Sequence, residues 1–387
     1  MKPSSIVAAI VLVLASAASA FAQDPRAAAE AAFTGDVHSS AGLKCDSCHK
    51  GGDYKPIART AIPALCASCH ADPAYMRKFN AQVRVDQYAQ YLTSAHGRGI
   101  VKGETRVAVC ADCHGAHGVR RPRDARSPVA PQNVANTCAK CHADPERMKP
   151  FGHPSTTFAD WSSSVHANAL LKRGDMSAPT CSTCHGSHGA TPPGVSDVAN
   201  VCAQCHVREA ELFIKSPKKD IFEAMGQAQC LACHSNHAIL PPSHRMIGFD
   251  KEAVCSTCHD ESGNGASTIK EFRAGLEGLS AAMVRATDVV DRAERSGMLV
   301  DNARLALHDA GDQYLQARVS IHAFAPEPFA GLAAKGLATS TEAEKDGYAA
   351  LDELQFRRRG LAVATIFIVG FLITLVLKIR RLPPPAV

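Results

Sequence analysis

The longest uncharged apolar stretch of the chain lies near its C-terminus. Residues 360–377 read GLAVATIFIVGFLITLVL and contain no charged side chain. This stretch is long enough to cross a bilayer. Basic residues flank it on both sides: Arg357, Arg358 and Arg359 before it, and Lys378, Arg380 and Arg381 after it. We predict a single transmembrane helix over residues 360–378 with a short tail at 379–387.

A second apolar run begins the chain. Lys2 precedes IVAAIVLVLA, and the following ASAASAFA offers small-residue cleavage positions at Ala20 and Ala22. About ten strongly apolar residues are too few to span a membrane, and the arrangement is typical of a secretory signal peptide. We predict a signal peptide at 1–22. Everything from Gln23 to the C-terminal span then lies on the periplasmic side of the cytoplasmic membrane, and the tail lies in the cytoplasm.

Two segments have the period of amphipathic helices. Apolar residues three and four apart predict a helix over 268–295: Ile269, Phe272, Leu276, Leu279, Met283, Val290 and Ala293. A second helix is predicted over 301–324, before Pro326. On it His308, Leu315 and His322 are seven apart and should share an inward-facing stripe. We expect a helical hairpin at 266–325. In the linker at 326–359, a helix from about Thr341 should run into the span and tie the preceding region close to the bilayer.

The cysteines follow a single pattern, C-x-x-C-H, which occurs eight times. This is the attachment signature of c-type haem, because two thiols three residues apart can bind both vinyl groups of one porphyrin. The adjacent histidine is then the proximal iron ligand. The predicted attachment residues are Cys45, Cys48, Cys66, Cys69, Cys110, Cys113, Cys138, Cys141, Cys181, Cys184, Cys202, Cys205, Cys230, Cys233, Cys255 and Cys258, with proximal His49, His70, His114, His142, His185, His206, His234 and His259. Eight covalently bound haem c groups are therefore expected.

Three other uses of cysteine are less consistent with this pattern. Zinc ribbons contain C-x-x-C pairs but do not need a histidine directly after each pair. Disulfides suit an exported chain but do not select this spacing. A thioredoxin-like redox motif would accompany a βαβ pattern, which the sequence lacks.

Ten further histidines are available for eight distal positions. Most are interleaved with the motifs, which favours two histidine ligands on most or all irons. The candidates are His38, His96, His117, His153, His166, His188, His237, His244, His322 and, as the weakest, His308. His188 follows proximal His185 by only three residues, so we expect it to bind a neighbouring iron.

An internal repeat of about 70 residues relates the motifs. CASCHADPAYMRKF from Cys66 matches CAKCHADPERMKPF from Cys138, and SAHGRGI matches SVHANAL. A shorter third unit starts at Cys202 and has no histidine at the S-x-H position. One of its haems should therefore take a ligand from elsewhere, and His322 is the favoured donor.

Composition indicates how this region folds. The whole chain has one Trp, six Tyr and 14 Phe, which is little material for a large apolar core. We predict a mainly α fold with extensive loops, in which haems form the core of an octahaem domain at residues 23–265. The formal net charge of +5 gives no reason to expect nucleic-acid binding.

The stretches CADCHGAHGV, CSTCHGSHGA and CLACHSNHAI, with SAHGRGI and SVHANAL upstream, resemble multihaem cytochromes c of the cytochrome c3-type or doubled-CXXCH family. The resemblance covers roughly residues 38–260, and the C-terminal part looks like a membrane-attached form. It implies a respiratory electron carrier between a donor at the membrane and a periplasmic or extracellular acceptor.

Two alternatives remain open. One is an octahaem oxidoreductase that reduces a small nitrogen or sulfur oxyanion at a five-coordinate haem, near Cys230 or Cys255. The other is a subunit of a quinol-oxidising membrane complex. With two strong axial ligands on each iron, an electron carrier of low potential is the preferred interpretation.

Overall fold

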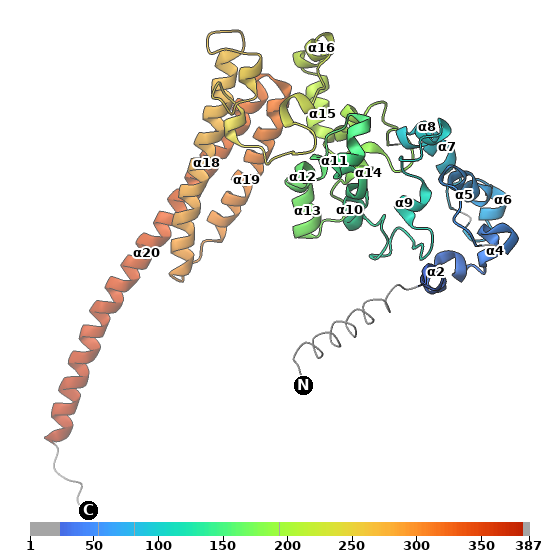
Figure 1. The fold of residues 1–387 in the computed structure, drawn as a ribbon. Helices are drawn as coiled ribbons and strands as arrows, with labels where there is room; N and C mark the ends of the chain where they lie inside the picture. The colour runs from blue at the N-terminus through green and yellow to red at the C-terminus, as the bar shows by residue number, and fades with distance from the viewer. Residues whose placement is uncertain (1–23, 53, 81, 193, 382–387) are drawn as a thin grey trace, which may run out of the picture. The chain divides into compact units, whose positions relative to one another are not determined.

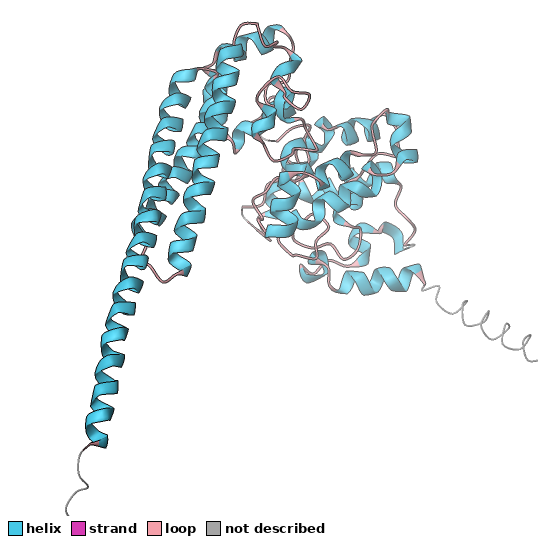
Figure 2. Ribbon diagram, turned by 90° about the vertical axis from the view of Figure 1, so that its left-hand side faces the viewer, coloured by secondary structure: helices cyan, strands magenta, loops and turns pink. Residues whose placement is uncertain are grey.

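The structure is a computed structural model that describes residues 24–381 apart from 53, 81 and 193. The predicted signal peptide at 1–22 lies outside the described residues. The described part contains helices and loops and no strand, which confirms the mainly α prediction (Figure 2). It divides into two compact units, which we describe separately: unit 1 is residues 24–201 and 234–241, and unit 2 is residues 202–233 and 242–381 (Figure 1).

Unit 1 consists of short helices joined by loops. Its α-helices are α2 (Pro25–Thr34), α3 (Val37–Ser40), α4 (Cys45–Cys48), α5 (Ile62–His70), α6 (Pro73–Met76), α7 (Gln87–Thr93), α8 (Ala95–Val101), α9 (Cys110–His114), α10 (Pro131–His142), α11 (Pro145–Met148), α12 (Thr157–Ser162), α13 (Val165–Arg173) and α14 (Cys181–His185). Three short 3-10 helices accompany them: η2 (Lys50–Gly52), η3 (Arg59–Ala61) and η4 (Lys149–Phe151).

The repeat seen in the sequence recurs as local structure. In both HADP segments an aspartate caps the next short helix: Asp72 accepts hydrogen bonds from two backbone N–H groups of α6, and Asp144 does the same for α11. A proline occupies the first helical position each time, where its missing N–H costs nothing. The motif helices α5 and α10 are therefore followed by the same kind of aspartate-capped helix start.

Unit 2 combines short elements with a long three-helix bundle. Its elements are α15 (Val207–Ile214), α16 (Pro217–Ala224), η6 (His244–Met246), η7 (Cys255–Thr257), α18 (Ala266–Arg295), α19 (Asp301–Ser320), η8 (Ile321–Ala323) and α20 (Pro326–Arg380). The elements η5 (Val198–Gln204) and α17 (Leu231–His234) lie where the chain passes between the units.

The bundle corrects the predicted hairpin. The last helix starts at Pro326, not near Thr341, and runs unbroken to Arg380. A proline at the first helical position supports this earlier start. Helix α20 packs along α18 at three glycines, because a Cβ at Gly275, Gly336 or Gly347 would lie under 3 Å from a side chain of the facing helix. The predicted linker is thus the third helix of the bundle.

The stripe on α19 was also predicted on the wrong face. The side chains of His308 and Leu315 are exposed. A second set spaced by seven, Ala303, Ala310 and Ala317, is buried instead. Small alanines let α19 approach its neighbours closely, so these residues form the contact and the larger side chains face outward.

The bundle sets the distance between the last motif and the candidate membrane span. The motif at Cys255 directly precedes α18, whose 30 residues measure about 45 Å at 1.5 Å per residue. The turn after α18 packs against Ala350 and Leu351 of α20, and from there α20 continues alone (Figure 1). Within unit 2 the motif therefore lies at the end of the bundle away from the candidate span, and the expectation that the preceding region lies close to the bilayer stays a prediction.

The free end of α20 is consistent with a single membrane anchor. It is the one candidate span among the described residues, with a mean hydropathy of 2.7 in its most apolar window. The side chains of that window are not buried by the protein, as expected for a helix that contacts lipid.

Candidate haem-binding site

Five of the eight motifs have both cysteines on one short α-helix (α4, α5, α9, α10 and α14), and in the other three one cysteine lies on η5, α17 or η7 and the second in the adjoining turn. Cys110–His114 and Cys181–His185 each form a complete short helix, α9 and α14. Both end at a glycine with positive φ, Gly115 at 84° and Gly186 at 80°, a conformation that favours glycine. All 16 cysteines are free thiols in the structure, so each pair is available for covalent attachment.

Five motif histidines each face a histidine from outside the motifs. The pairs, with the separation of their ring centres, are His70 and His38 (6.0 Å), His49 and His117 (6.2 Å), His142 and His96 (6.2 Å), His114 and His188 (6.1 Å), and His185 and His237 (5.8 Å). All ten residues belong to unit 1. The structure thus brings together half of the predicted distal candidates with five of the predicted proximal ligands.

These separations fit a metal between the two rings. An imidazole nitrogen binds a transition metal at about 2 Å and the ring centre lies about 1 Å behind it, so two imidazoles on one metal have centres roughly 6 Å apart. Among the residues that the structure describes, no group of three or more His, Cys, Asp or Glu side chains could hold a bare metal ion. Pairs of facing imidazoles suit an iron whose other ligands come from a porphyrin.

Three of the pairs follow a regular register. His117, His188 and His237 each come three residues after a motif histidine. Each faces a motif histidine that lies earlier in the chain, two motifs back: His49, His114 and His185 respectively. His188 therefore lies beside His114 and not over its own neighbour, His185.

The other two pairs use histidines at helix starts. His96 is the second residue of α8, whose cap Ser94 accepts a hydrogen bond from the Gly97 N–H at 3.0 Å. His38 follows Asp36, a fully buried carboxylate that accepts from the His38 backbone N–H (2.8 Å), from the Val119 N–H (2.7 Å) and from His38 Nδ1 (2.9 Å). The carboxylate holds the proton on Nδ1 and leaves Nε2 free to bind a metal.

The electrostatics of these imidazoles favour the neutral, ligating form. Burial lowers the pKa of six paired histidines, and for each of them a nearby basic group also lowers it: His70, His96, His114, His142, His185 and His188. A neutral imidazole carries the lone pair that a metal needs.

Consecutive motifs are neighbours within each unit. A hydrogen bond between the thiols of Cys66 and Cys110 raises the pKa of Cys66 and lowers that of Cys110 to about 7. The same relation holds between Cys138 and Cys181 in the next repeat, where the pKa of Cys181 is also lowered to about 7.

The remaining neighbours extend this order. Burial raises the pKa of Cys48 and of Cys113, and the nearby thiols of Cys69 and Cys141, respectively, add to the effect. In unit 2 a hydrogen bond between the thiols of Cys202 and Cys230 lowers the pKa of Cys202 to about 6. The Cys233 thiol lies near those of Cys255 and Cys258. Within each unit, the motifs therefore lie beside one another in the order of the sequence.

The histidine of the last motif, in unit 2, has a lysine as its neighbour where the five pairs of unit 1 have a histidine. Nε2 of His259 lies 2.9 Å from Nζ of Lys218, and Nδ1 donates to the carbonyl oxygen of Asn264 at 3.0 Å. Among the other predicted ligands, His244 forms a hydrogen bond to the Tyr314 hydroxyl at 2.6 Å.

Other candidates lie elsewhere. The side chain of His308 is 73 % exposed beside Asp309 and Asp312. His153 lies close enough to His142 to lower the pKa of His142, after the larger effect of burial. His166 is the second residue of α13 after the cap Ser164, and Nδ1 of His322 donates to the Val319 carbonyl at 2.9 Å.

Sequence reasoning missed three side chains near the motifs. They are Asp36, Lys218 and Arg59, whose guanidinium makes a two-pronged contact with Asp112 inside the third motif (2.7 and 3.1 Å). A signal existed for one of them, since SPK at 216–218 stands where SAH and SVH stand in the other repeats. Asp36 and Arg59 carry no such mark in the sequence.

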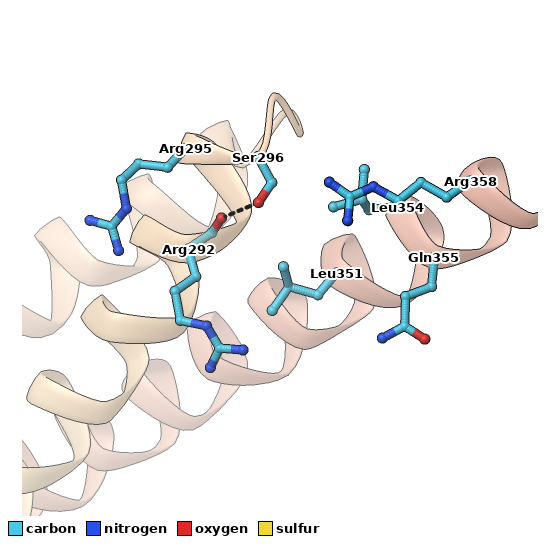
Figure 3. A pocket seen from close by; sticks show the side chains of 7 residues that line it. All are labelled: Arg292, Arg295, Ser296, Leu351, Leu354, Gln355 and Arg358. Atoms are coloured by element: carbon cyan, nitrogen blue, oxygen red, sulfur yellow. Dashed lines mark hydrogen bonds between the residues drawn. The ribbon is translucent and has the colours of Figure 1, made fainter.

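A pocket of about 350 Å³ lies near the turn after α18 in unit 2, and its lining contains no motif residue. It is lined by Arg292, Arg295, Ser296, Leu351, Leu354, Gln355 and Arg358 (Figure 3). Ser296 donates a hydrogen bond to the Arg292 carbonyl there at 2.8 Å. None of these side chains is a good proton acceptor near neutral pH.

Comparison with known proteins gives one match. The profile of the family described as cytochrome c3 matches residues 37–143 and 174–260. These two regions together make up half of the chain and contain all eight motifs. No curated protein and no solved structure matches the chain.

Proposed function

Since the chain belongs to the cytochrome c3 family, we propose that it is a membrane-anchored octahaem cytochrome c that carries electrons on the exported side of the cytoplasmic membrane. The observation that carries this proposal is the set of five facing histidine pairs in unit 1. An iron with an imidazole on each side has no open position for a substrate, so it exchanges electrons without binding one.

Each of the eight motifs would hold one haem through its two cysteines and bind the iron through its own histidine. Bound haem supplies the one-electron chemistry. The chain supplies the axial ligands, fixes their tautomers and excludes water from the imidazoles. His166, in the position of His96 within the repeat, and His322 remain proposed distal ligands.

The order of the motifs supports a path for electrons. Within each unit, motifs that are consecutive in the sequence also lie next to each other in space, as the interactions between their thiols indicate. Electrons would pass between adjacent haems, and two imidazole ligands favour low reduction potentials because neither is the methionine that raises them.

The bundle bears on the identity of the donor. The last motif lies at the end of α18 away from the span, about 45 Å along a 30-residue helix. This length favours a donor protein with an exported redox centre over direct contact with quinol in the bilayer. The pocket beside the span offers no side chain that would accept the protons of a quinol. We propose redox partner proteins on both sides of the transfer.

Intact-mass measurement of the purified full-length protein, together with a reductive titration, tests the proposal. We expect eight covalently bound haems on a chain that starts near Gln23, all reducible by a low-potential donor. Fewer haems would refute the octahaem assignment. A high-potential titration for the whole set would argue against paired imidazole ligands.

A further inference from the structure

Helix α16 repeats a local structure that supplies axial histidines elsewhere in the chain. In α8, α13 and α16 a serine caps the helix: Ser94, Ser164 and Ser216. All three serines are buried, and each accepts a hydrogen bond from a backbone N–H of the first turn at 3.0, 3.1 and 3.2 Å, respectively. The position two residues after the serine therefore lies in the first turn of a serine-capped helix three times, although the N–H that bonds to the serine belongs to the third residue after it in α8 and α13 and to the second, Lys218, in α16.

That position carries His96 in α8, His166 in α13 and Lys218 in α16. His96 faces the motif histidine His142. Lys218 likewise faces a motif histidine, since its Nζ lies 2.9 Å from Nε2 of His259. The third repeat has not lost its S-x-H element but has a lysine in place of the histidine.

The tautomer of His259 makes this contact specific. A carbonyl oxygen can only accept, so the contact of Nδ1 with the Asn264 carbonyl at 3.0 Å fixes the proton on Nδ1. Nε2 then carries the lone pair that would bind the iron. Lys218 is directed at that atom, where the distal ligand belongs.

We propose that Lys218 is the distal axial ligand of the haem attached at Cys255 and Cys258, so that this iron has one histidine and one lysine ligand. Two ligands on one metal, each at about 2 Å, are roughly 4 Å apart. The lysine side chain has a flexible four-carbon stem, so its Nζ can move by the distance of about 1 Å that accommodates the iron between the two nitrogens.

The surroundings of Lys218 are consistent with this role. Its neighbour Lys219 bonds to Glu223 at 3.0 Å and lies near Asp220. Lys218 instead points to His259 and lies 5.9 Å from the centre of the Phe324 ring. The two adjacent lysines therefore differ in partner, and Lys219 provides a matched control.

The test compares four variants of the full-length holoprotein by electron paramagnetic resonance in the oxidised state. Lys218→Ala and Lys218→Arg should each create one high-spin haem per chain, because neither side chain can bind iron. Lys218→His should stay fully low-spin, and Lys219→Ala should match the parent. The arginine variant matters because it keeps a long side chain with a hydrogen-bond donor while removing the ligand.

Two outcomes overturn the proposal. One is a Lys218→Arg protein that remains fully low-spin, and the other is a parent protein that already has a high-spin haem that Lys218→Ala leaves unchanged. Near-infrared magnetic circular dichroism adds a second readout, since the ligand-sensitive band of one haem should shift in Lys218→His. No shift there would also contradict an amine ligand.

The inference rests on the proposed haem at Cys255, so haem content is measured first in every variant by intact mass. A parent with no haem at this motif would refute the attachment. If the parent carries this haem but the Lys218→Ala and Lys218→Arg proteins show no spin change, only the assignment of Lys218 as a ligand is refuted. Far-ultraviolet circular dichroism shows whether a variant has folded.

Discussion

The haem-binding repeats and the three-helix bundle are stabilised by different kinds of core. In the bundle, apolar side chains such as Leu276, Leu279 and Val290 are almost fully buried. The repeats contain a small apolar cluster around Trp161 and Leu170, but at the motifs the groups that face one another are imidazoles and thiols. We expect that the bundle can fold from its side chains, whereas the repeats need haems to fill their interior.

The comparison predicts its largest effect when haem is withheld. A chain made without haem attachment should lose the fold of residues 37–260, because binding energy is folding energy for such sites. The bundle at 266–359 should stay helical. Limited proteolysis followed by mass spectrometry should recover the bundle as a resistant fragment. Protection of the repeats in the haem-free chain would contradict the account.

The second effect concerns the bundle alone. Leu279→Ala removes a buried side chain that packs at Gly336, and should lower the free energy of unfolding by about 2–5 kcal/mol. Urea unfolding followed by circular dichroism measures this change. The visible haem spectrum should not change, and the exposed Leu305 (62 % exposed) gives the control, Leu305→Ala, with little effect. A spectral change in Leu279→Ala would show that the two regions are not independent.

A third effect concerns a single haem in the repeats. His96→Ala removes the imidazole that faces His142 and should produce one high-spin haem without global unfolding. His153→Ala is the control, because the ring that faces His142 is that of His96. Electron paramagnetic resonance distinguishes the two variants. A high-spin signal in His153→Ala, with none in His96→Ala, would reverse the assignment.

The smallest effect concerns the support of a ligand. Asp36→Asn removes the carboxylate that accepts a hydrogen bond from Nδ1 of His38. The imidazole should then donate less electron density to its iron, which raises the reduction potential of one haem. A spectroelectrochemical titration resolves the shift, with the exposed Asp309→Asn on α19 as control. An equal shift in both variants would mean that only overall charge matters.

The sequence predicted the two regions unequally well. The helices predicted over 268–295 and 301–324 followed from periodicity and the candidate span from the length of an uncharged apolar run, and they agree with the structure apart from their exact ends, as does the mainly α class. The start of α20 was missed because residues 326–340 are rich in alanine and glycine and show no strong apolar stripe. The inward face of α19 was misassigned because a seven-residue spacing fits both the histidines and the buried alanines.

For the haem ligands, the motifs predict the attachment cysteines and the proximal histidines but do not predict the pairing of the distal histidines. Spacing alone could not reveal that His188 would lie beside His114, because this depends on the packing of separate helices. Lys218 was overlooked because the search at the S-x-H position was for histidine. Buried partners such as Asp36 become visible only when the fold brings Val119 and His38 to one carboxylate.

The central claim is that each haem iron is held between two side-chain ligands and has no open position. Quantitative electron paramagnetic resonance of the oxidised full-length protein tests it most directly. The account predicts low-spin haems only, summing to the haem count found by intact mass. A high-spin signal equivalent to one haem per chain would contradict it and favour an enzyme that binds a substrate at that iron.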